Sequence, residues 1–136
     1  TVPFLDLLVR LTKADRDQDH IDAIVLQHAT TPDRTAALLD PTAPDPTPAL
    51  VADAQRLERM GADFLVLPCN SAHIFTEPVE RAISIELLSI VQETASVALA
   101  LADGPIAVFA TEGTIHAGTY HEAITRGGGI VWTCLL

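Results

Sequence analysis

The chain has 136 residues, of which 49% are apolar and 19% charged, and its formal net charge is −10. These proportions support a folded core of one domain or slightly more and exclude a disordered chain. The acidic balance argues against nucleic acid or an anionic membrane as a partner.

The cysteines and the hydropathy bear on three further features: metal sites, disulfides and membrane spans. Cys69 and Cys134 form neither a metal-ligand spacing nor a disulfide framework, so we expect no metal site. Reduced thiols fit a cytoplasmic protein best. No apolar run reaches the ~18 residues that a membrane span requires.

The first third of the chain predicts a helix, a strand and a second helix. Residues 2–13 carry apolar side chains at helical spacing, and the apolar run at 21–27 predicts a strand. A polar loop follows and enters a short helix at 35–39. In this loop Arg34 is the one cation that could bind a carboxylate through two parallel hydrogen bonds. An ordinary surface arginine would show the same local pattern.

The middle of the chain predicts a helix and then a buried strand. Residues 40–48 hold four prolines and predict a stiff loop. The helix expected at 49–60 ends at Gly61, which suits a C-terminal cap. The strand expected at 63–67 has no polar residue after its first position. Such a run is typical of a parallel strand covered on both faces.

The turn after this strand, Cys69-Asn70-Ser71, is the candidate reactive centre. In an open α/β sheet, ligands bind beyond the carboxyl ends of the strands. A helix that begins near Ser71 would direct free N–H groups toward the Cys69 sulfur, which favours the thiolate, or would hold a substrate carboxylate. A small thiol packed at a strand end is the alternative. His73 could orient the thiol or a substrate, or it could be a capping or surface residue.

The last part of the chain continues the alternation of strands and helices. A short helix or irregular segment is expected at 72–81, strands at 82–89, 106–110 and 130–136, and helices at 90–102 and 115–125. Thr111 and Thr114 flank Gly113 where the last helix begins, so they could bind an anion there or act only as a capping box. Cys134 is expected to be a buried strand thiol.

Three stretches, in this order, resemble the aspartate/glutamate racemase family, most closely its aspartate racemases. They are Asp-Gln-Asp-His-Ile at 17–21 with Pro-Asp-Arg-Thr at 32–35, Gly-Ala-Asp-Phe-Leu-Val-Leu-Pro-Cys-Asn-Ser-Ala-His at 61–73, and Thr-Glu-Gly-Thr-Ile at 111–115 with Gly118 and Tyr120. The resemblance implies an α/β fold of parallel, flavodoxin-like βαβ units in the ATC-like racemase architecture. It also implies that residues 1–102 form a first domain without its opening strand, that 103–136 begin a second domain, and that the chain is truncated.

The same resemblance implies an activity and a set of site residues. The activity would be cofactor-independent racemisation of aspartate or a related acidic amino acid, in a homodimer. Cys69 would be one acid/base, and Arg34 would pair with a substrate carboxylate. The other residues expected to contact the substrate are Asn70, Ser71, Thr111, Thr114, His73 and His28.

Three departures from the family pattern leave alternatives open. Ser71 replaces a threonine, His28 replaces an asparagine, and Cys134 lacks the Gly-Cys-Thr-Glu surroundings of the second family cysteine. One alternative is another enzyme of the superfamily, such as a hydantoin racemase, maleate isomerase or arylmalonate decarboxylase. The other is an inactive half that binds a ligand without catalysis.

Overall fold

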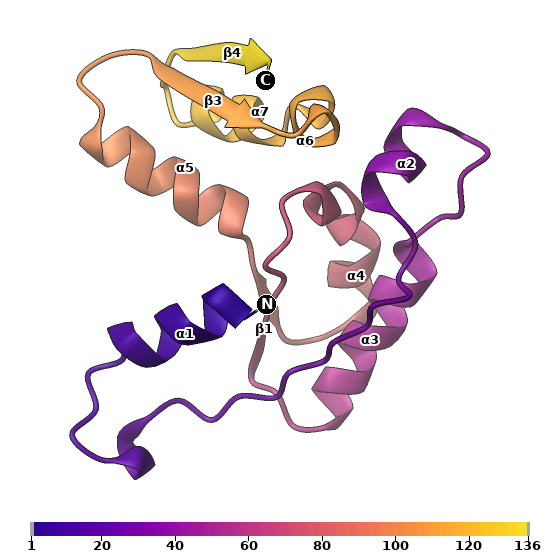
Figure 1. The fold of residues 1–136 in the computed structure, drawn as a ribbon, viewed down its shortest axis with the longest axis vertical. Helices are drawn as coiled ribbons and strands as arrows, with labels where there is room; N and C mark the ends of the chain where they lie inside the picture. Colours follow the sequence, from indigo (N-terminus) through magenta and orange to yellow (C-terminus); the bar gives the residue numbers. More distant parts are fainter. Residues whose placement is uncertain (1, 136) are drawn as a thin grey trace.

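Two separate pairs of parallel strands organise the structure, and helices pack around each pair (Figure 1). The computed structural model describes residues 2–135. In each pair the chain leaves the first strand, forms helices and returns as the parallel second strand. These are βαβ units, because parallel neighbours need a crossover connection. The α/β class predicted from the sequence is therefore confirmed.

The first unit contains strands β1 (Phe64–Val66) and β2 (Glu86–Leu88), which pair with Phe64 opposite Glu86. Helices α3 (Thr47–Arg59) and α4 (Thr76–Ala82) pack against each other and against the strands. A short 3-10 helix, η2 (Ser71–Phe75), joins β1 to α4. The buried core of this unit consists of Ala54, Leu65 and Val79.

The second unit contains strands β3 (Ile106–Ala110) and β4 (Val131–Leu135), with Ile106 opposite Val131. Helices α5 (Ile90–Leu101) and α7 (Thr119–Arg126) pack against each other beside this sheet (Figure 1). The buried core of this unit consists of Val91, Ala95, Ala123 and Ile124. Helix α5 therefore packs in the same core as β3 and β4. The expected boundary between two domains at residue 102 stays a prediction.

Three further α-helices and a 3-10 helix, η1 (Asp17–Asp19), complete the described chain. Helix α1 (Val2–Leu11) agrees with the predicted N-terminal helix, and none of its residues is buried. Helix α2 (Arg34–Leu39) begins one residue earlier than predicted, and Asp33 caps it by accepting hydrogen bonds from the Thr35 and Ala36 N–H groups. Helix α6 (Glu112–Ala117) follows β3 directly. Thr1, which the sequence suggests as the start of the first helix, α1, lies outside the described residues.

The strand predicted at 21–27 is wrong. This segment contains no strand, and its apolar side chains Ile21, Ile24 and Val25 are 51%, 43% and 47% exposed. An apolar run favours a strand only where a neighbouring backbone completes the hydrogen-bond ladder. Neither described sheet pairs with this segment, so the preference is not realised.

The single helix predicted at 115–125 is also wrong, because two helices cover this region. Gly118 ends α6 and precedes α7 with a positive φ of 66°, a conformation that glycine adopts without steric cost. The consequence is a change of direction between α6 and α7. The predicted positive-φ cap at Gly61 is confirmed, with φ 93°. The side chain of Cys134 lies outside the described residues, so its burial stays a prediction.

The carboxylate of Glu58, near the end of α3, links this helix to the segment after α4. Its Oε1 accepts hydrogen bonds from the Ser84 N–H at 2.7 Å and the Ser84 hydroxyl at 2.6 Å. These two hydrogen bonds hold the pKa of the Glu58 carboxyl below its ordinary value of 4.5. The folded state therefore favours the ionised carboxylate over the protonated one.

A change in pH should reveal this link. A lowered folded-state pKa stabilises the fold above pH 4.5, and the contribution disappears as the pH falls through that lowered pKa. We expect Glu58→Gln to lower the melting temperature at neutral pH, and the difference from wild type to shrink in acid. Thermal unfolding followed by circular dichroism across this range measures both. Glu86→Gln is the matched control, since Glu86 is exposed and its carboxylate makes no hydrogen bond within residues 2–135. A difference that stays constant with pH would contradict the assignment.

Candidate active site

The Cys69 turn follows β1 and leaves its thiol half-buried, not sealed in the core. The Cys69 Sγ lies 3.7 Å from the Ser71 hydroxyl oxygen, within reach of a weak sulfur hydrogen bond. The helix predicted to begin near Ser71 is the 3-10 helix η2, and the Asn70 side chain makes no capping hydrogen bond to it. Five residues align fewer peptide dipoles than a long α-helix does. The immediate polar neighbour of the sulfur is therefore the Ser71 hydroxyl.

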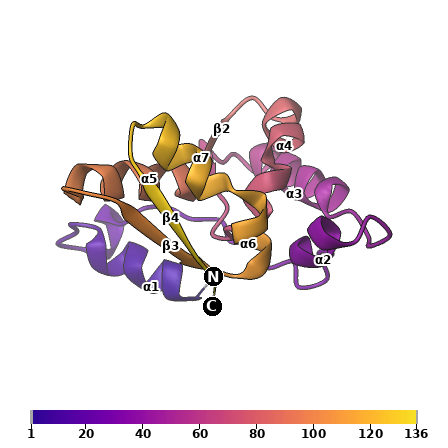
Figure 2. The ribbon, with the colours of Figure 1, turned by 90° about the horizontal axis from the view of Figure 1, so that it is seen from above.

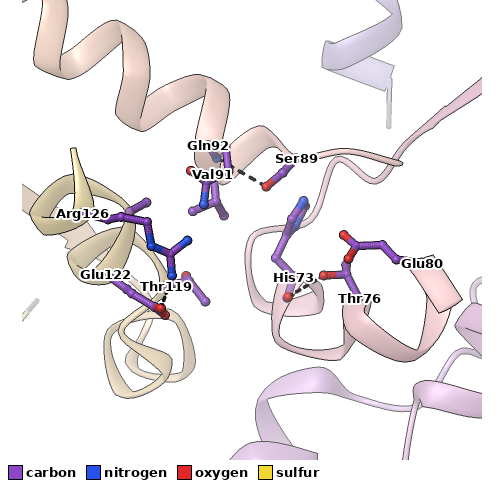
Figure 3. A pocket seen from close by; sticks show the side chains of 10 residues that line it. His73, Thr76, Glu80, Ser89, Val91, Gln92, Thr119, Glu122 and Arg126 are labelled. Atoms are coloured by element: carbon purple, nitrogen blue, oxygen red, sulfur yellow. Dashed lines mark hydrogen bonds and ion pairs between the residues drawn. The ribbon is translucent and has the colours of Figure 1, made fainter. Parts of the chain in front are cut away.

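His73 supports the main chain of this turn. Its Nδ1 lies 2.9 Å from the backbone carbonyl oxygen of Cys69. Because a carbonyl oxygen only accepts, Nδ1 carries the hydrogen and donates it. The other ring nitrogen, Nε2, is buried without a hydrogen-bond partner among the described residues, and His73 is one of the residues around a cavity between α4, α5 and α7 (Figure 3). His73 thus positions the turn, and a direct contact with substrate stays a prediction.

Helix α6 places the segment from Thr111 to Thr114 against the first unit. Helices α2, α6 and η2 contact one another pairwise, and Figures 1 and 2 show α6 beside α2. The approach is closest at Gly113, where an added Cβ would lie 2.9 Å from the Thr35 Oγ1 and 3.0 Å from its Cγ2. The starts of three helical segments therefore meet, and each carries predicted site residues.

The two threonines of this segment, Thr111 and Thr114, differ in exposure. Thr111 is exposed and is the N-cap of α6, but its side chain makes no capping hydrogen bond. Thr114 is 4% exposed, and its hydroxyl lies 3.2 Å from the Thr111 hydroxyl. Thr111 can therefore present its oxygen to a ligand while Thr114 orients it.

Tyr120 is a residue near the site that sequence reasoning did not assign to it. Its hydroxyl donates a hydrogen bond of 2.8 Å to the Asn70 Oδ1, across 50 positions of sequence. The carbonyl end of the Asn70 amide is then occupied, and the NH₂ end can donate elsewhere. Tyr120 lies in α7 and Asn70 precedes η2, so this hydrogen bond joins the two units. Tyr120 belongs to the family-like motif that begins at Thr111, but the sequence could not reveal its partner, because Asn70 lies 50 positions away.

Arg34 lies at the first position of α2 and is held by its own loop. Its Nη1 donates to the Pro32 carbonyl at 3.0 Å and, more weakly, to the Thr31 carbonyl at 3.4 Å. The residue is half-buried, and its Nε and Nη2 make no hydrogen bond within the described part of the chain. The guanidinium is therefore oriented while part of its donor set can bind an anion.

Within the chain, His28 pairs with the carboxylate of Asp53. Its Nδ1 lies 2.6 Å from the Asp53 carboxylate of α3, and the two side chains are 39% and 23% exposed. This pair ties the loop before α2 to α3. A contact between His28 and a substrate stays a prediction.

Neither a metal site nor a membrane helix emerges from residues 2–135. Within that range no group of three or more His, Cys, Asp or Glu side chains could hold a metal ion. The helices described there are all too short or too polar to cross a membrane.

Comparison with known proteins gives one consistent set of relatives. The sequence pattern of the Asp/Glu/hydantoin racemase family matches residues 1–133. The broad specificity amino-acid racemase RacX of Bacillus subtilis (strain 168) is 36% identical over 80 residues, which are 59% of this chain and 35% of that protein. A glutamate racemase of Koribacter versatilis (strain Ellin345) is 35% identical over 74 residues, 53% of this chain and 25% of that protein.

A solved structure agrees with these sequence matches. The Picrophilus torridus aspartate racemase superposes with a TM-score of 0.87 and 25% identity, covering 97% of this chain and 56% of that one. This superposition confirms the predicted racemase-type α/β architecture. The chain spans about half of that solved structure, and its matches cover about a third or less of the two relatives.

The contact at Gly113 can be tested by adding one methyl group. We expect Gly113→Ala to destabilise the fold, because overpacking costs about 1–3 kcal/mol, more than the ~1 kcal/mol that alanine gains over glycine in a helix. Chemical denaturation measures the free energy of unfolding, and the amide resonances of Thr35 and Thr111 report the local shift.

Two further variants show whether the Thr35 contact is the cause. Gly104→Ala is the matched control, since a Cβ at that exposed turn meets nothing within 4 Å. Thr35→Ala should partly rescue Gly113→Ala, because it removes the two nearest atoms and leaves the Thr35 Cβ at 3.2 Å. An unchanged stability together with unshifted Thr35 and Thr111 resonances would refute the close approach.

Proposed function

The chain belongs to the Asp/Glu/hydantoin racemase family, and from this premise we propose that it supplies one acid/base half of a cofactor-independent amino-acid racemase. The substrate is aspartate or a related acidic amino acid. The observation that carries the proposal is the pairwise contact of α2, η2 and α6, together with a half-buried Cys69 two residues before η2. The proposal includes a homodimeric, cytoplasmic protein that needs no pyridoxal cofactor.

Cys69 is the proposed acid/base. As a thiolate it removes the α-hydrogen of the amino acid as a proton, and the C–H electron pair stays on the α-carbon and spreads into the α-carboxylate. Inversion requires that the carbon receive its new proton from an acid on the opposite face, so Cys69 is one of two such groups. With Cys69 alone, the thiol exchanges its proton with solvent and returns one to the same face, which gives exchange without inversion. The Ser71 hydroxyl, 3.7 Å from the sulfur, can donate to the thiolate and stabilise it.

Hydrogen-bond donors around Cys69 stabilise the negative charge that develops on the substrate. The Asn70 amide and the Ser71 hydroxyl belong to the two residues that directly follow Cys69. Thr111 contributes its hydroxyl from the start of α6. Thr114 is buried beneath Thr111 and supports its hydroxyl. Donors fixed before the reaction need little reorganisation when the charge forms, which lowers the barrier.

Arg34 is proposed to bind the second carboxylate of an amino diacid. A guanidinium can bind a carboxylate through two parallel hydrogen bonds, and that geometry favours acidic substrates over neutral ones. Two relatives are named glutamate racemase and aspartate racemase, which supports an acidic substrate. The relative named as a broad specificity racemase supports a wider range. A superfamily enzyme of another reaction type, such as maleate isomerase, remains the alternative function.

Tyr120 is proposed as a positioning residue for Asn70. Because its hydroxyl donates to the Asn70 Oδ1 at 2.8 Å, the amide NH₂ group is directed away from Tyr120 and toward other acceptors. Without this hydrogen bond the Asn70 amide, which is exposed, can rotate. Tyr120 therefore acts through Asn70 and does not itself contact the substrate.

The role of Cys69 can be tested by hydrogen exchange. We expect the wild-type chain to replace the α-proton of aspartate with deuterium in deuterated water, measured by NMR. Cys69→Ala and Cys69→Ser should slow this exchange by about 10²–10⁴-fold, the usual effect of removing a general base. Cys134→Ser is the matched control and should leave the exchange rate unchanged, since its sequence context does not fit the second family cysteine.

Two outcomes would reject catalysis by this chain. Binding of aspartate without any exchange by the wild type would favour the alternative of a ligand-binding half. Exchange that persists in Cys69→Ala would assign the base to another residue.

The role of Tyr120 can be tested without turnover. In the Tyr120→Phe variant we expect the side-chain NH₂ resonances of Asn70 to shift in the free protein and to respond less to added aspartate. The expected weakening of aspartate binding is up to about tenfold, the effect of one hydrogen bond of about 1 kcal/mol. Unchanged amide resonances of the α5–α7 core would show that the fold is intact. Asn70 resonances identical to wild type would exclude the positioning role.

A further inference from the structure

Arg34 ends a loop, residues 28–34, whose own hydrogen bonds make it one connected piece. The Thr31 N–H and hydroxyl donate to the His28 carbonyl at 3.3 Å and 2.9 Å. The Arg34 Nη1 in turn donates to the Pro32 carbonyl at 3.0 Å and to the Thr31 carbonyl at 3.4 Å. Because these hydrogen bonds follow one another along the loop, a displacement of His28 is passed on to the guanidinium.

Two anchors attach this loop to the rest of the fold. The downstream anchor is the packing of α2 against α6 at Thr35. The upstream anchor is the contact of 2.6 Å between the His28 Nδ1 and the Asp53 Oδ2. In the described part of the chain it is the one side-chain hydrogen bond that joins segment 21–39 to another helix or strand. Without it, the loop would be held only from the side of α2.

The contact between His28 and Asp53 is a charge-assisted hydrogen bond. An ionised carboxylate only accepts, so the His28 Nδ1 carries the hydrogen and donates it. The two side chains are 39% and 23% exposed, so water covers the contact only in part. Asp53 precedes the buried core residue Ala54 in α3, which places its carboxylate on the packed part of the first unit.

We propose that Asp53 is a positioning residue for Arg34 and acts through His28. The inference rests on the substrate role of Arg34 proposed above. Asp53 holds His28, the His28 carbonyl holds the turn at Thr31, and carbonyls of this turn orient the guanidinium. The remaining donors, Nε and Nη2, are then directed before a substrate carboxylate arrives. Such preorganisation raises affinity, because less ordering is left for the binding step.

The charge of Asp53 separates this role from a simple electrostatic effect. Asp53 is itself a carboxylate, so its negative charge repels a second carboxylate that approaches Arg34. If Asp53 acted only through its charge, its removal would strengthen the binding of an anion. The positioning role predicts weaker binding. The direction of the change therefore decides between the two.

Succinate is a suitable probe, because it carries two carboxylates and its binding requires no turnover. We expect Asp53→Ala to weaken succinate binding by about three- to tenfold, the scale of one lost hydrogen bond, as measured by calorimetry. Asp53→Asn keeps an acceptor for the His28 Nδ1 and should retain most of the affinity. Asp22→Ala is the matched control and should not weaken binding, since Asp22 is exposed and its carboxylate makes no hydrogen bond within residues 2–135.

A second readout needs no ligand. In Asp53→Ala we expect the Arg34 Nε–H and Thr31 amide resonances to shift, while the amides of the α5–α7 core stay unchanged. Alanine is a strong helix former, so α3 should persist in this variant. His28→Ala should shift the same resonances. The double variant should weaken succinate binding no more than either single variant, because both substitutions remove one contact.

Several results would overturn the inference. Unchanged or stronger succinate binding by Asp53→Ala, with weaker binding by Arg34→Gln, would reject the positioning role and leave the proposed substrate site standing. Unshifted Arg34 resonances in Asp53→Ala, or additive losses in the double variant, would reject the positioning role as well. Absence of succinate binding, or binding that Arg34→Gln does not reduce, would instead refute the substrate role of Arg34 and this inference with it.

Discussion

The close approach of α2 to α6 at Gly113 is the contact on which the geometry of the site depends. Each unit has its own small core, and the cores share no buried residue. Helix α6 follows β3 of the second unit, yet it packs against α2 and against η2 of the first unit. Gly113 permits this because its missing side chain leaves room for Thr35. A larger residue would separate Thr111 from the Cys69 turn even if both cores remained intact.

Polar contacts reinforce the same junction from both sides of the Cys69 turn. Tyr120 of α7 donates a hydrogen bond to the Asn70 Oδ1, and His73 donates one to the Cys69 carbonyl. The first of these hydrogen bonds crosses between the two units, and the second lies within the turn itself. A small change in how the units sit together would therefore alter the direction of the Asn70 amide.

The sequence predicted the loops of the candidate site that directly follow β-strands. Residues 106–110 form the strand that their apolar pattern indicated, and the loops carrying Cys69 and Thr111 both follow strands of parallel pairs. Other features could not be predicted, because they depend on distant neighbours. The segment at 21–27 has strand-forming residues without a pairing partner in the described sheets, and Gly118 divides a helix that periodicity alone makes continuous. The Tyr120–Asn70 hydrogen bond arises only from tertiary packing.

An acidic protein can bind an acidic amino acid because the repulsion between like charges and the hydrogen bonds of a binding site act over different distances. The formal net charge of −10 creates a repulsive field, but salt screens exposed charges beyond a Debye length of about 8 Å at physiological ionic strength. In the proposed substrate site, the half-buried Arg34, the Asn70 amide and the threonine hydroxyls would act at hydrogen-bond distances, where screening is small. Because the loop carbonyls of Thr31 and Pro32 already orient Arg34, little side-chain entropy remains to be lost on binding. Selectivity at such a site therefore comes from the fixed positions of a few donors, while the overall charge mainly slows the approach of the substrate.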